Sequence, residues 1–141
     1  MNAFFDTSVL VPVFYDDHEH HGTSLECLLR FNRKQACCGA HSFAEVYSSL
    51  TRMPGKHRIS GAQAMLFLND MRERLTIVSL DGHEYFDAIA RAGAAGVVGG
   101  TIYDAVLARC ALKAKADIIY TWNVKHYGQF GWDAAKRVRT P

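Results

Sequence analysis

Apolar residues along the chain form short runs and helical repeats that are separated by polar turns. The apolar residues 3–5 predict a buried strand that ends at Asp6-Thr7, where a helix continuing through residues 9–11 begins. Leucines recur near helical period within residues 19–33, and residues 35–39 have the composition of a second short buried strand. The beginning of the chain is therefore predicted to alternate strands with helices.

The same alternation continues to the end of the chain. A helix is predicted over residues 41–53, because Phe43, Val46, Tyr47 and Leu50 fall on one of its faces, and Pro54-Gly55 ends it. The remaining pattern predicts helices over residues 60–74, around 85–92 and over 101–116, with strands over 75–78, 117–121 and, at the edge, 136–140. We therefore expect a single α/β domain over residues 1–141, with a mainly parallel sheet and helices on both faces.

Composition places the chain among ordinary globular proteins. Hydrophobic residues make up 49% and charged residues 21% of the 141 positions, which excludes disordered and fibrous classes. The longest strongly apolar run, residues 9–15, is too short to cross a membrane, and the first residues lack the pattern of a secretory signal. We expect a cytoplasmic protein without a membrane partner, whose four cysteines are reduced and buried because no pair has CxxC spacing.

Charge is unevenly distributed, although the net charge of +2 alone indicates no partner. Residues 105–141 contain only two acids, Asp117 and Asp133, against a series of bases: Arg109, Lys113, Lys115, Lys125, Lys136, Arg137 and Arg139. This end of the chain could face phosphate groups.

Polar residues at a few separated positions are candidates for a common site. Asp6 and Thr121-Trp122-Asn123 follow predicted strands, and sites in parallel sheets gather beyond the carboxyl ends of the strands. Glu45 and Asp104 fall early in helices that follow loops, so the fold could bring them to the same edge. Each acid also has an ordinary alternative: Asp6 as a helix cap, Glu45 as an exposed boundary residue and Asp104 as a first-turn acid.

Three separated segments together resemble the PIN-domain ribonucleases, and specifically the VapC-like toxins of type II toxin–antitoxin systems. The segments are FFDTSVLVPVF, SFAEVYSSLTR and TIYDAVLARCALKAKADIIYTWNVKHY, and their order and spacing match the family over nearly the whole chain. The resemblance implies a PIN-like three-layer fold with a central sheet of about five strands. It also implies an endoribonuclease toxin that depends on Mg²⁺ or Mn²⁺.

The resemblance assigns roles residue by residue. Asp6, Glu45 and Asp104 match the family's first three acids, which would hold the metal, and oxygen ligands are those that these cations prefer. Thr121 and Asn123 match the final T-x-D or T-x-N motif, so an amide stands where many members have a fourth acid. A second metal would therefore have one charged ligand fewer.

Within such a site, Asp6 is the candidate to bridge two cations, Asp104 to complete the metal shell, and Glu45 to hold or deprotonate the attacking water. Thr7 matches the small hydroxyl residue that lines the site in the family. The candidates for substrate binding are Thr7, Thr121, Trp122 and Lys125. Trp122, with His126 and Tyr127 nearby, either stacks on RNA bases or packs in the core.

The resemblance further implies a homodimer and a cognate antitoxin whose C-terminal segment enters the acidic groove. Two other functions stay open. A PIN scaffold could bind RNA or protein without cutting it, since Asn123 departs from full acidity. An aspartate-based phosphatase or phosphoacceptor domain could also begin with an apolar strand before Asp6-Thr7, although Ser8 stands where such phosphatases usually have a second acid.

Two other segments carry chemistry-bearing residues but are interpreted as structural. The run Asp16-Asp17-His18-Glu19-His20-His21 is interpreted as a solvated helix start rather than a metal site. The glycines at 93, 96, 99 and 100 lack the preceding strand that a dinucleotide loop needs. Asp81, Asp87 and Asp117 are interpreted as caps or surface charges.

Overall fold

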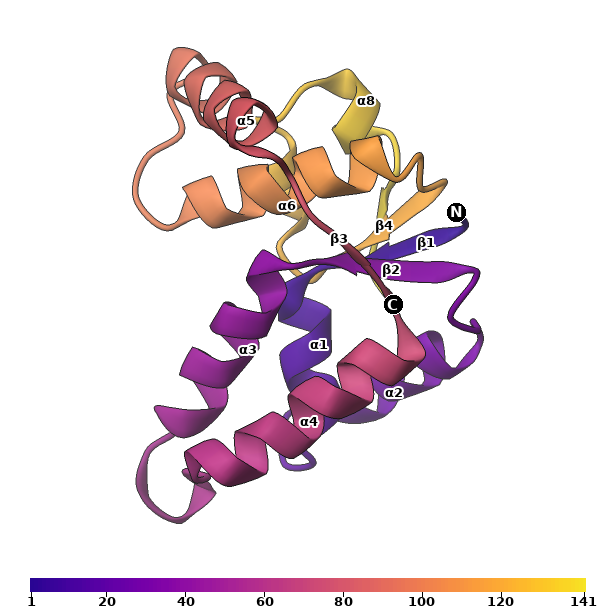
Figure 1. Ribbon diagram of the computed structural model, residues 1–141, viewed down its shortest axis with the longest axis vertical. Coiled ribbons are helices and arrows are strands. Elements are labelled where there is room, and N and C mark those ends of the chain that lie inside the picture. Colours follow the sequence, from indigo (N-terminus) through magenta and orange to yellow (C-terminus); the bar gives the residue numbers. More distant parts are fainter.

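Short parallel strands form a central sheet in the computed structural model, which describes residues 1–141 (Figure 1). The sheet has five strands in the order β3-β2-β1-β4-β5, and every neighbouring pair is parallel. The strands are β1 (Ala3–Phe5), β2 (Ala36–Gly39), β3 (Thr76–Val78), β4 (Ile118–Tyr120) and β5 (Val138–Arg139).

Helices cover both faces of the sheet. Figure 1 shows α1 to α4 on one side of the strands and α5, α6 and α8 on the other. The helices are α1 (Thr7–Phe14), α2 (His21–Leu29), α3 (His41–Thr51), α4 (Gly61–Arg74), α5 (Gly82–Ala94), α6 (Thr101–Lys113), α7 (Val124–Tyr127) and α8 (Trp132–Ala135), with a 3₁₀ turn at Gly55–His57. The predicted three-layer α/β fold is therefore confirmed.

The alternation of side chains along β1 builds a separate core on each face of the sheet. Phe5 packs into the core below α1 to α4, where its ring stacks on Tyr120 with centroids 5.4 Å apart. Its neighbour Phe4 belongs to the other core, with Leu107 of α6 and Ile119 of β4. Because β1 is buried on both faces, its three residues are all apolar.

Helix α6 lies very close to β2, and this requires glycine at position 39. A Cβ atom at Gly39 would lie 2.7 Å from Leu107 Cδ2 and 3.3 Å from Cys110 Sγ. All four cysteines are free and buried, as predicted. Cys37 and Cys38 lie on opposite faces of β2, one in each core.

Several predicted boundaries differ from the observed ones. Helix α2 spans only His21–Leu29, because turns flank it on both sides, and α6 ends at Lys113 before Lys115 adopts a positive φ of 55°. Helices α7 and α8 were not predicted, since four residues are too few to establish a helical repeat. The predicted edge strand is confirmed as β5, which pairs with β4.

Most of the basic residues near the C-terminus are engaged within the chain. Arg109 pairs with Asp87, Lys113 with Glu84 and Lys136 with Asp133. Arg137 and Arg139 donate to backbone carbonyls. Of the bases that were expected to face phosphates, Lys115 and Lys125 alone have no such partner. No helix has the length and apolar content needed to cross a bilayer.

The chain connections create a switch point between β1 and β4. From β1 the chain runs through α1 and α2 to β2, whereas β4 is reached through α5 and α6 on the opposite face. Such a point leaves a crevice beyond the carboxyl ends of the two strands, where ligands bind in open α/β sheets. Asp6 follows β1 there, and Thr121 follows β4.

Candidate functional site

Asp6 lies fully buried at the switch point, where β1 ends beside β4. Its backbone N–H donates to the Tyr120 carbonyl at 3.0 Å. Its side-chain Oδ2 accepts hydrogen bonds from Thr121 Oγ1 at 2.5 Å and from Ser8 Oγ at 2.9 Å. The other oxygen, Oδ1, is buried and has no hydrogen-bond partner. Oδ1 is therefore a buried oxygen whose hydrogen-bonding capacity the protein itself leaves unsatisfied.

The helix-cap alternative for Asp6 is wrong. Asp6 occupies the N-cap position of α1, yet its side chain makes no capping hydrogen bond. Asp81 shows what a capping aspartate does here, because its Oδ1 accepts the Glu84 N–H at 2.8 Å in a capping box. The prediction that Asp81 is a cap is thus confirmed, and the two aspartates have different roles.

Glu45 is half-buried on α3, and a hydroxyl group of α1 donates a hydrogen bond to its carboxylate. Thr7 Oγ1 donates to Glu45 Oε1 at 3.0 Å and lies 2.9 Å from Ser42 Oγ. Glu45 is therefore not a boundary residue that only faces water. Thr7 connects it to the first turn of α1, next to Asp6.

Asp104 lies in the first turn of α6 and is buried. Its Oδ2 lies 2.5 Å from Nδ1 of His126 on α7. His126, which was considered as a contact for RNA, thus contacts an acidic residue of the site.

Burial and mutual repulsion set the electrostatics of the acidic residues. Burial raises the pKa of Asp6 to about 6, and the Asp104 charge adds to this increase, while the Thr121 and Ser8 hydrogen bonds oppose it. Burial likewise raises the pKa of Glu45 to about 7; the Thr7 hydrogen bond opposes this, and the charges of Asp6 and Asp104 add to it. The acids therefore share one region of negative potential, which favours a bound cation.

A cleft of about 400 Å³ opens beside these residues. Its lining combines residues of α1, α3, α6, the segment before α2 and the segment after β4: Thr7, Ser8, Val11, Pro12, His18, His20, Glu45, Ser49, Asp104, Trp122 and Asn123. Among the predicted site residues, Asp6 and Thr121 are fully buried and do not line it, and Lys125 is exposed on α7 outside the lining. The side chains do not form a ready-made cluster of three or more metal-type ligands.

Sequence reasoning did not identify Ser8 as part of the site. Ser8 Oγ donates to Asp6, lies 3.2 Å from Thr121 Oγ1 and accepts the Trp122 N–H at 2.9 Å. It was considered only as a departure from a phosphatase motif. Its position two residues after Asp6, at the start of a helix, was the available signal, because that spacing lets the hydroxyl reach back to the carboxylate.

The histidine-rich segment before α2 also reaches the cleft, which its sequence did not predict. Asp16, Asp17 and Glu19 are exposed, whereas His18 and His20 are half-buried and line the cleft. Burial lowers the pKa of His18, and the neighbouring His20 adds to this effect. The segment is therefore a structured turn with its imidazoles turned inward.

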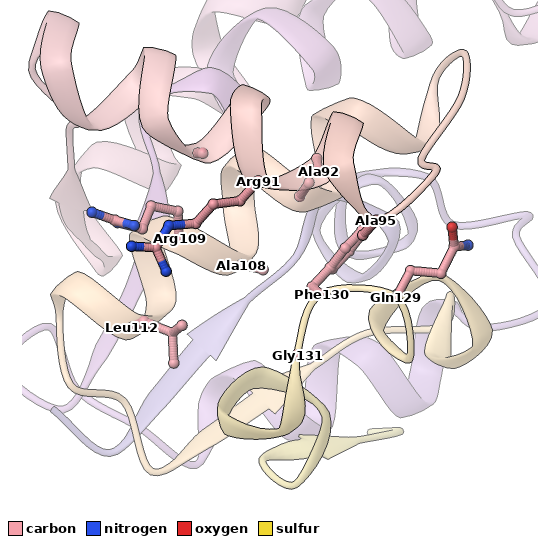
Figure 2. Close-up of a pocket in the computed structure, with 11 residues that line it drawn as sticks. Arg91, Ala92, Ala95, Ala108, Arg109, Leu112, Gln129, Phe130 and Gly131 are labelled. Carbon is pink, nitrogen blue, oxygen red and sulfur yellow. The ribbon is translucent and has the colours of Figure 1, made fainter.

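A second hollow, of about 450 Å³, lies between α5, α6 and the segment that joins α7 to α8 (Figure 2). Small side chains such as Ala88, Ala92 and Ala108 create the space, and Phe130 closes one side. Arg91 and Arg109 lie at its edge, where both pair with Asp87 at 2.9 Å. No predicted site residue lines this hollow, so it is separate from the acidic cleft.

Comparisons with known proteins agree with this geometry. The family model described as PIN domain matches residues 3–126. Ribonuclease VapC40 of Mycobacterium tuberculosis is 33% identical over 114 residues, which cover 81% of each chain. The crystal structure of M. tuberculosis VapC20, described as a sarcin-ricin loop cleaving toxin, superposes with a TM-score of 0.74 at 13% identity, over 90% of this chain and 94% of that one. A toxin–antitoxin complex from Klebsiella pneumoniae gives a TM-score of 0.67 at 17% identity, over 99% and 98% of the two chains.

Proposed function

The chain belongs to the PIN domain family, and from this premise we propose that it is an endoribonuclease that cleaves RNA phosphodiester bonds as the toxin of a toxin–antitoxin pair. A relative that is named a ribonuclease supports the activity, and the likeness of the fold to VapC structures agrees with it. We further propose that residues 1–141 form one PIN domain, of which residues 3–126 match the family model.

The observation that carries this proposal is the incompletely satisfied carboxyl group of Asp6. Oδ1 is buried without a partner, and the Asp104 charge adds to the raised pKa of the group. A buried ionised carboxylate is costly unless an opposite charge compensates it. No base of this chain forms an ion pair with Asp6 or Glu45, so an external cation fits the donor set.

Asp6, Asp104 and Glu45 would hold Mg²⁺ or Mn²⁺, since hard divalent cations take oxygen ligands. When bound, such a cation activates water, orients the scissile phosphate and neutralises charge on the leaving oxygen. Some of the acidic side chains would move on binding, because they do not form a closed cluster in the structure. Asp104 forms a single side-chain hydrogen bond, to His126.

The residues of the chain supply positioning and proton transfer. Glu45 lines the cleft, where its carboxylate would hold or deprotonate the attacking water. Thr7 holds Glu45 in place, while Ser8 and Thr121 fix the Oδ2 side of Asp6. Asn123 and Trp122 line the cleft, where they would contact the RNA or its bound water.

The residue two positions after Asp6 argues against an aspartate-based phosphatase. Such phosphatases usually have a second aspartate there, whereas this chain has Ser8, whose hydroxyl group donates to Asp6 Oδ2 at 2.9 Å. A scaffold that binds RNA without cleaving it remains the principal alternative, because Asn123 replaces an acid.

A protein antitoxin is the second proposed partner, since a chain of similar fold occurs in a toxin–antitoxin complex. We also infer a homodimer, for which the exposed apolar side chains Phe86, Val98 and Trp132 offer surface. A monomer by light scattering at micromolar concentration would contradict the dimer. Buried reduced cysteines suit action in the cytoplasm.

Cleavage of single-stranded or looped RNA by the purified protein tests the proposal. Cleavage is expected with Mg²⁺ or Mn²⁺, to stop after chelation and to return when metal is restored. Full activity after rigorous chelation would contradict the metal dependence. Metal binding with no cleavage of any RNA would favour the scaffold.

A further inference from the structure

Two histidines that the proposed chemistry leaves unused line the same cleft as the acidic residues. His18 and His20 come from the segment between α1 and α2, and both rings are half-buried. The cleft thus has carboxylates from α3 and α6 in one part of its lining and imidazoles in another. Besides these rings and carboxylates, the lining contains the apolar residues Val11 and Pro12 and the hydroxyl groups of Thr7, Ser8 and Ser49.

Three rings of the cleft lining lie close together, and we call this group the aromatic wall: His18, His20 and Trp122. His20 lies flat on Trp122, with ring centroids 3.7 Å apart and planes 9° apart. The rings of His18 and His20 are 5.6 Å apart and tilted by 37°, and His18 Nδ1 accepts the His20 N–H at 3.0 Å. Glu19 Oε1 lies 3.6 Å from His20 Nε2 at the exposed rim. With a side chain 35% exposed, His20 remains open to a ligand.

Hydrogen bonds fix the aromatic wall relative to the acidic residues. Trp122 Nε1 donates to the buried Ser24 Oγ at 3.0 Å, which holds the indole against α2. The Trp122 N–H donates to Ser8 Oγ, and Ser8 Oγ donates to Asp6 Oδ2, each at 2.9 Å. One side chain therefore connects the wall to the carboxylate at the centre of the site.

The acidic residues cannot supply affinity for RNA by themselves, because carboxylates repel phosphates. Most of the bases near the C-terminus are engaged in contacts within the chain, and Lys115 and Lys125 are the exceptions. Stacking of bases on flat side chains does not depend on charge and tolerates any sequence. The wall offers such faces in the cleft that Glu45 and Asp104 also line.

We propose that the aromatic wall is a nucleobase-binding subsite, in which a base adjacent to the scissile phosphate of single-stranded RNA stacks on His20. This inference rests on the proposed function and adds the means by which the substrate is held. His20 binds the base, and Trp122 supports His20 from behind. His18 lies beside His20, with ring centroids 5.6 Å apart.

A double-mutant cycle between His20 and the RNA base tests the subsite. Binding is measured in an Asp6→Asn background, so that cleavage does not interfere, with a short fluorescent RNA whose bases are replaced one at a time by abasic nucleotides. The protein variants are His20→Ala, His20→Phe and, as a matched control, His83→Ala, since His83 is exposed on α5. Circular dichroism verifies that each variant is folded.

His20→Ala is expected to weaken binding of the intact RNA by about tenfold, the effect of losing one stacked base. His20→Phe should retain most of the affinity, and His83→Ala all of it. One abasic position should weaken binding to the parent but make no further difference to His20→Ala, because the two changes remove the same contact.

Unchanged binding by His20→Ala would overturn the subsite. So would an equal loss for intact and abasic RNA, which indicates an effect through the fold. If His20→Ala does not fold, the test is the affinity of the Asp6→Asn protein for each RNA with one abasic nucleotide. Equal affinity for all of these RNAs would contradict the proposal. Failure of the proposed function is distinguishable, because it would appear as lack of cleavage by the unmutated protein, whatever the binding result.

Discussion

Asp6 combines two environments in one carboxyl group. Oδ2 accepts two hydroxyl hydrogen bonds, while Oδ1 is buried without any. The folded protein therefore bears an unfavourable charge at this position when no cation is present. Removal of this charge should leave the metal-free protein as stable or more stable, whereas it should reduce cleavage. Such opposite effects identify a functional residue, because a structural residue would lose stability when replaced.

Replacement of Asp6 by Asn should leave the metal-free protein as stable as the parent, or more stable by about 1 kcal/mol, because the shape is retained and one repelling charge is removed. Urea midpoints measured in a chelating buffer test this. Asp16→Asn is the control, since Asp16 is an exposed acid whose charge does not belong to the site. Marked destabilisation by Asp6→Asn alone would contradict the repulsion argument.

Asn123 is the second residue with a specific expectation. Asn123→Asp should tighten Mn²⁺ binding, because it adds a charged oxygen to the cleft that Asn123 lines. Calorimetric titration measures the change, with Asn69→Asp on the exposed face of α4 as a control that adds the same charge elsewhere. Weaker or unchanged binding would remove Asn123 from the site.

The resemblance predicted Asp6, Glu45 and Asp104 as candidates, and the structure places Glu45 and Asp104 in the lining of one cleft and Asp6 buried next to Ser8, which lines it too. The sequence was not sufficient to predict Ser8 or His20. Ser8 reaches Asp6 and Trp122 only through the folded geometry of the switch point. His20 stacks on a residue more than a hundred positions away, and no local pattern encodes such a pair.

The contact between β2 and α6 fixes the position of the helix that carries Asp104. Gly39→Ala should destabilise the protein by about 1–3 kcal/mol, because the added Cβ would lie 2.7 Å from Leu107 Cδ2. Combining it with Leu107→Ala should cost less than the sum of the two single changes, since the smaller side chain makes room. Denaturant midpoints of the four proteins measure this. Strict additivity would show that the close approach is not the cause.

Elements with a long repeat were predictable, and short ones were not. Helices α3 to α6 each contain enough turns for apolar positions to recur, and strands β1 and β2 are apolar on both faces. Helices α7 and α8 have four residues each and depend on packing against α6. This matters for the site, because α7 carries His126, the partner of Asp104.

For the whole molecule, the raised pKa values predict how stability depends on pH. Folding raises the pKa of Asp6 from 3.8 to about 6 and the pKa of Glu45 from 4.5 to about 7. At a pH between the lower and the higher pKa of each group, the folded state therefore binds more protons than the unfolded state. Their contribution to the free energy of unfolding therefore decreases as pH rises from about 4 to 7.

Thermal midpoints of the metal-free protein and of Asp6→Asn across this pH range test the effect. The difference reports Asp6 together with its coupling to Glu45, because the Asp6 charge adds to the raised pKa of Glu45, while the other titrating groups are present in both proteins. The variant should gain stability relative to the parent as pH rises, and Mg²⁺ should raise the midpoint of the parent near pH 7. A difference that stays constant with pH would contradict the raised pKa of Asp6.

The alternation of strands and helices in the sequence was enough to predict the layered architecture. It was not enough to predict which side chains meet at the candidate site. Strand order places β1 beside β4, and helices from both faces bring Glu45 and Asp104 to the same cleft. Periodicity identifies neither the strand order nor the side chains that meet at an edge. Agreement of three separated motifs with one family supplied that information.

The most direct test of the account is the single-turnover rate of RNA cleavage by the parent and by Asp6→Asn at the same Mg²⁺ or Mn²⁺ concentration. An amide is a far weaker ligand than a carboxylate, so the rate should fall by orders of magnitude although the variant stays folded. Cleavage that survives in Asp6→Asn would contradict the assignment of the active site to the acidic cleft.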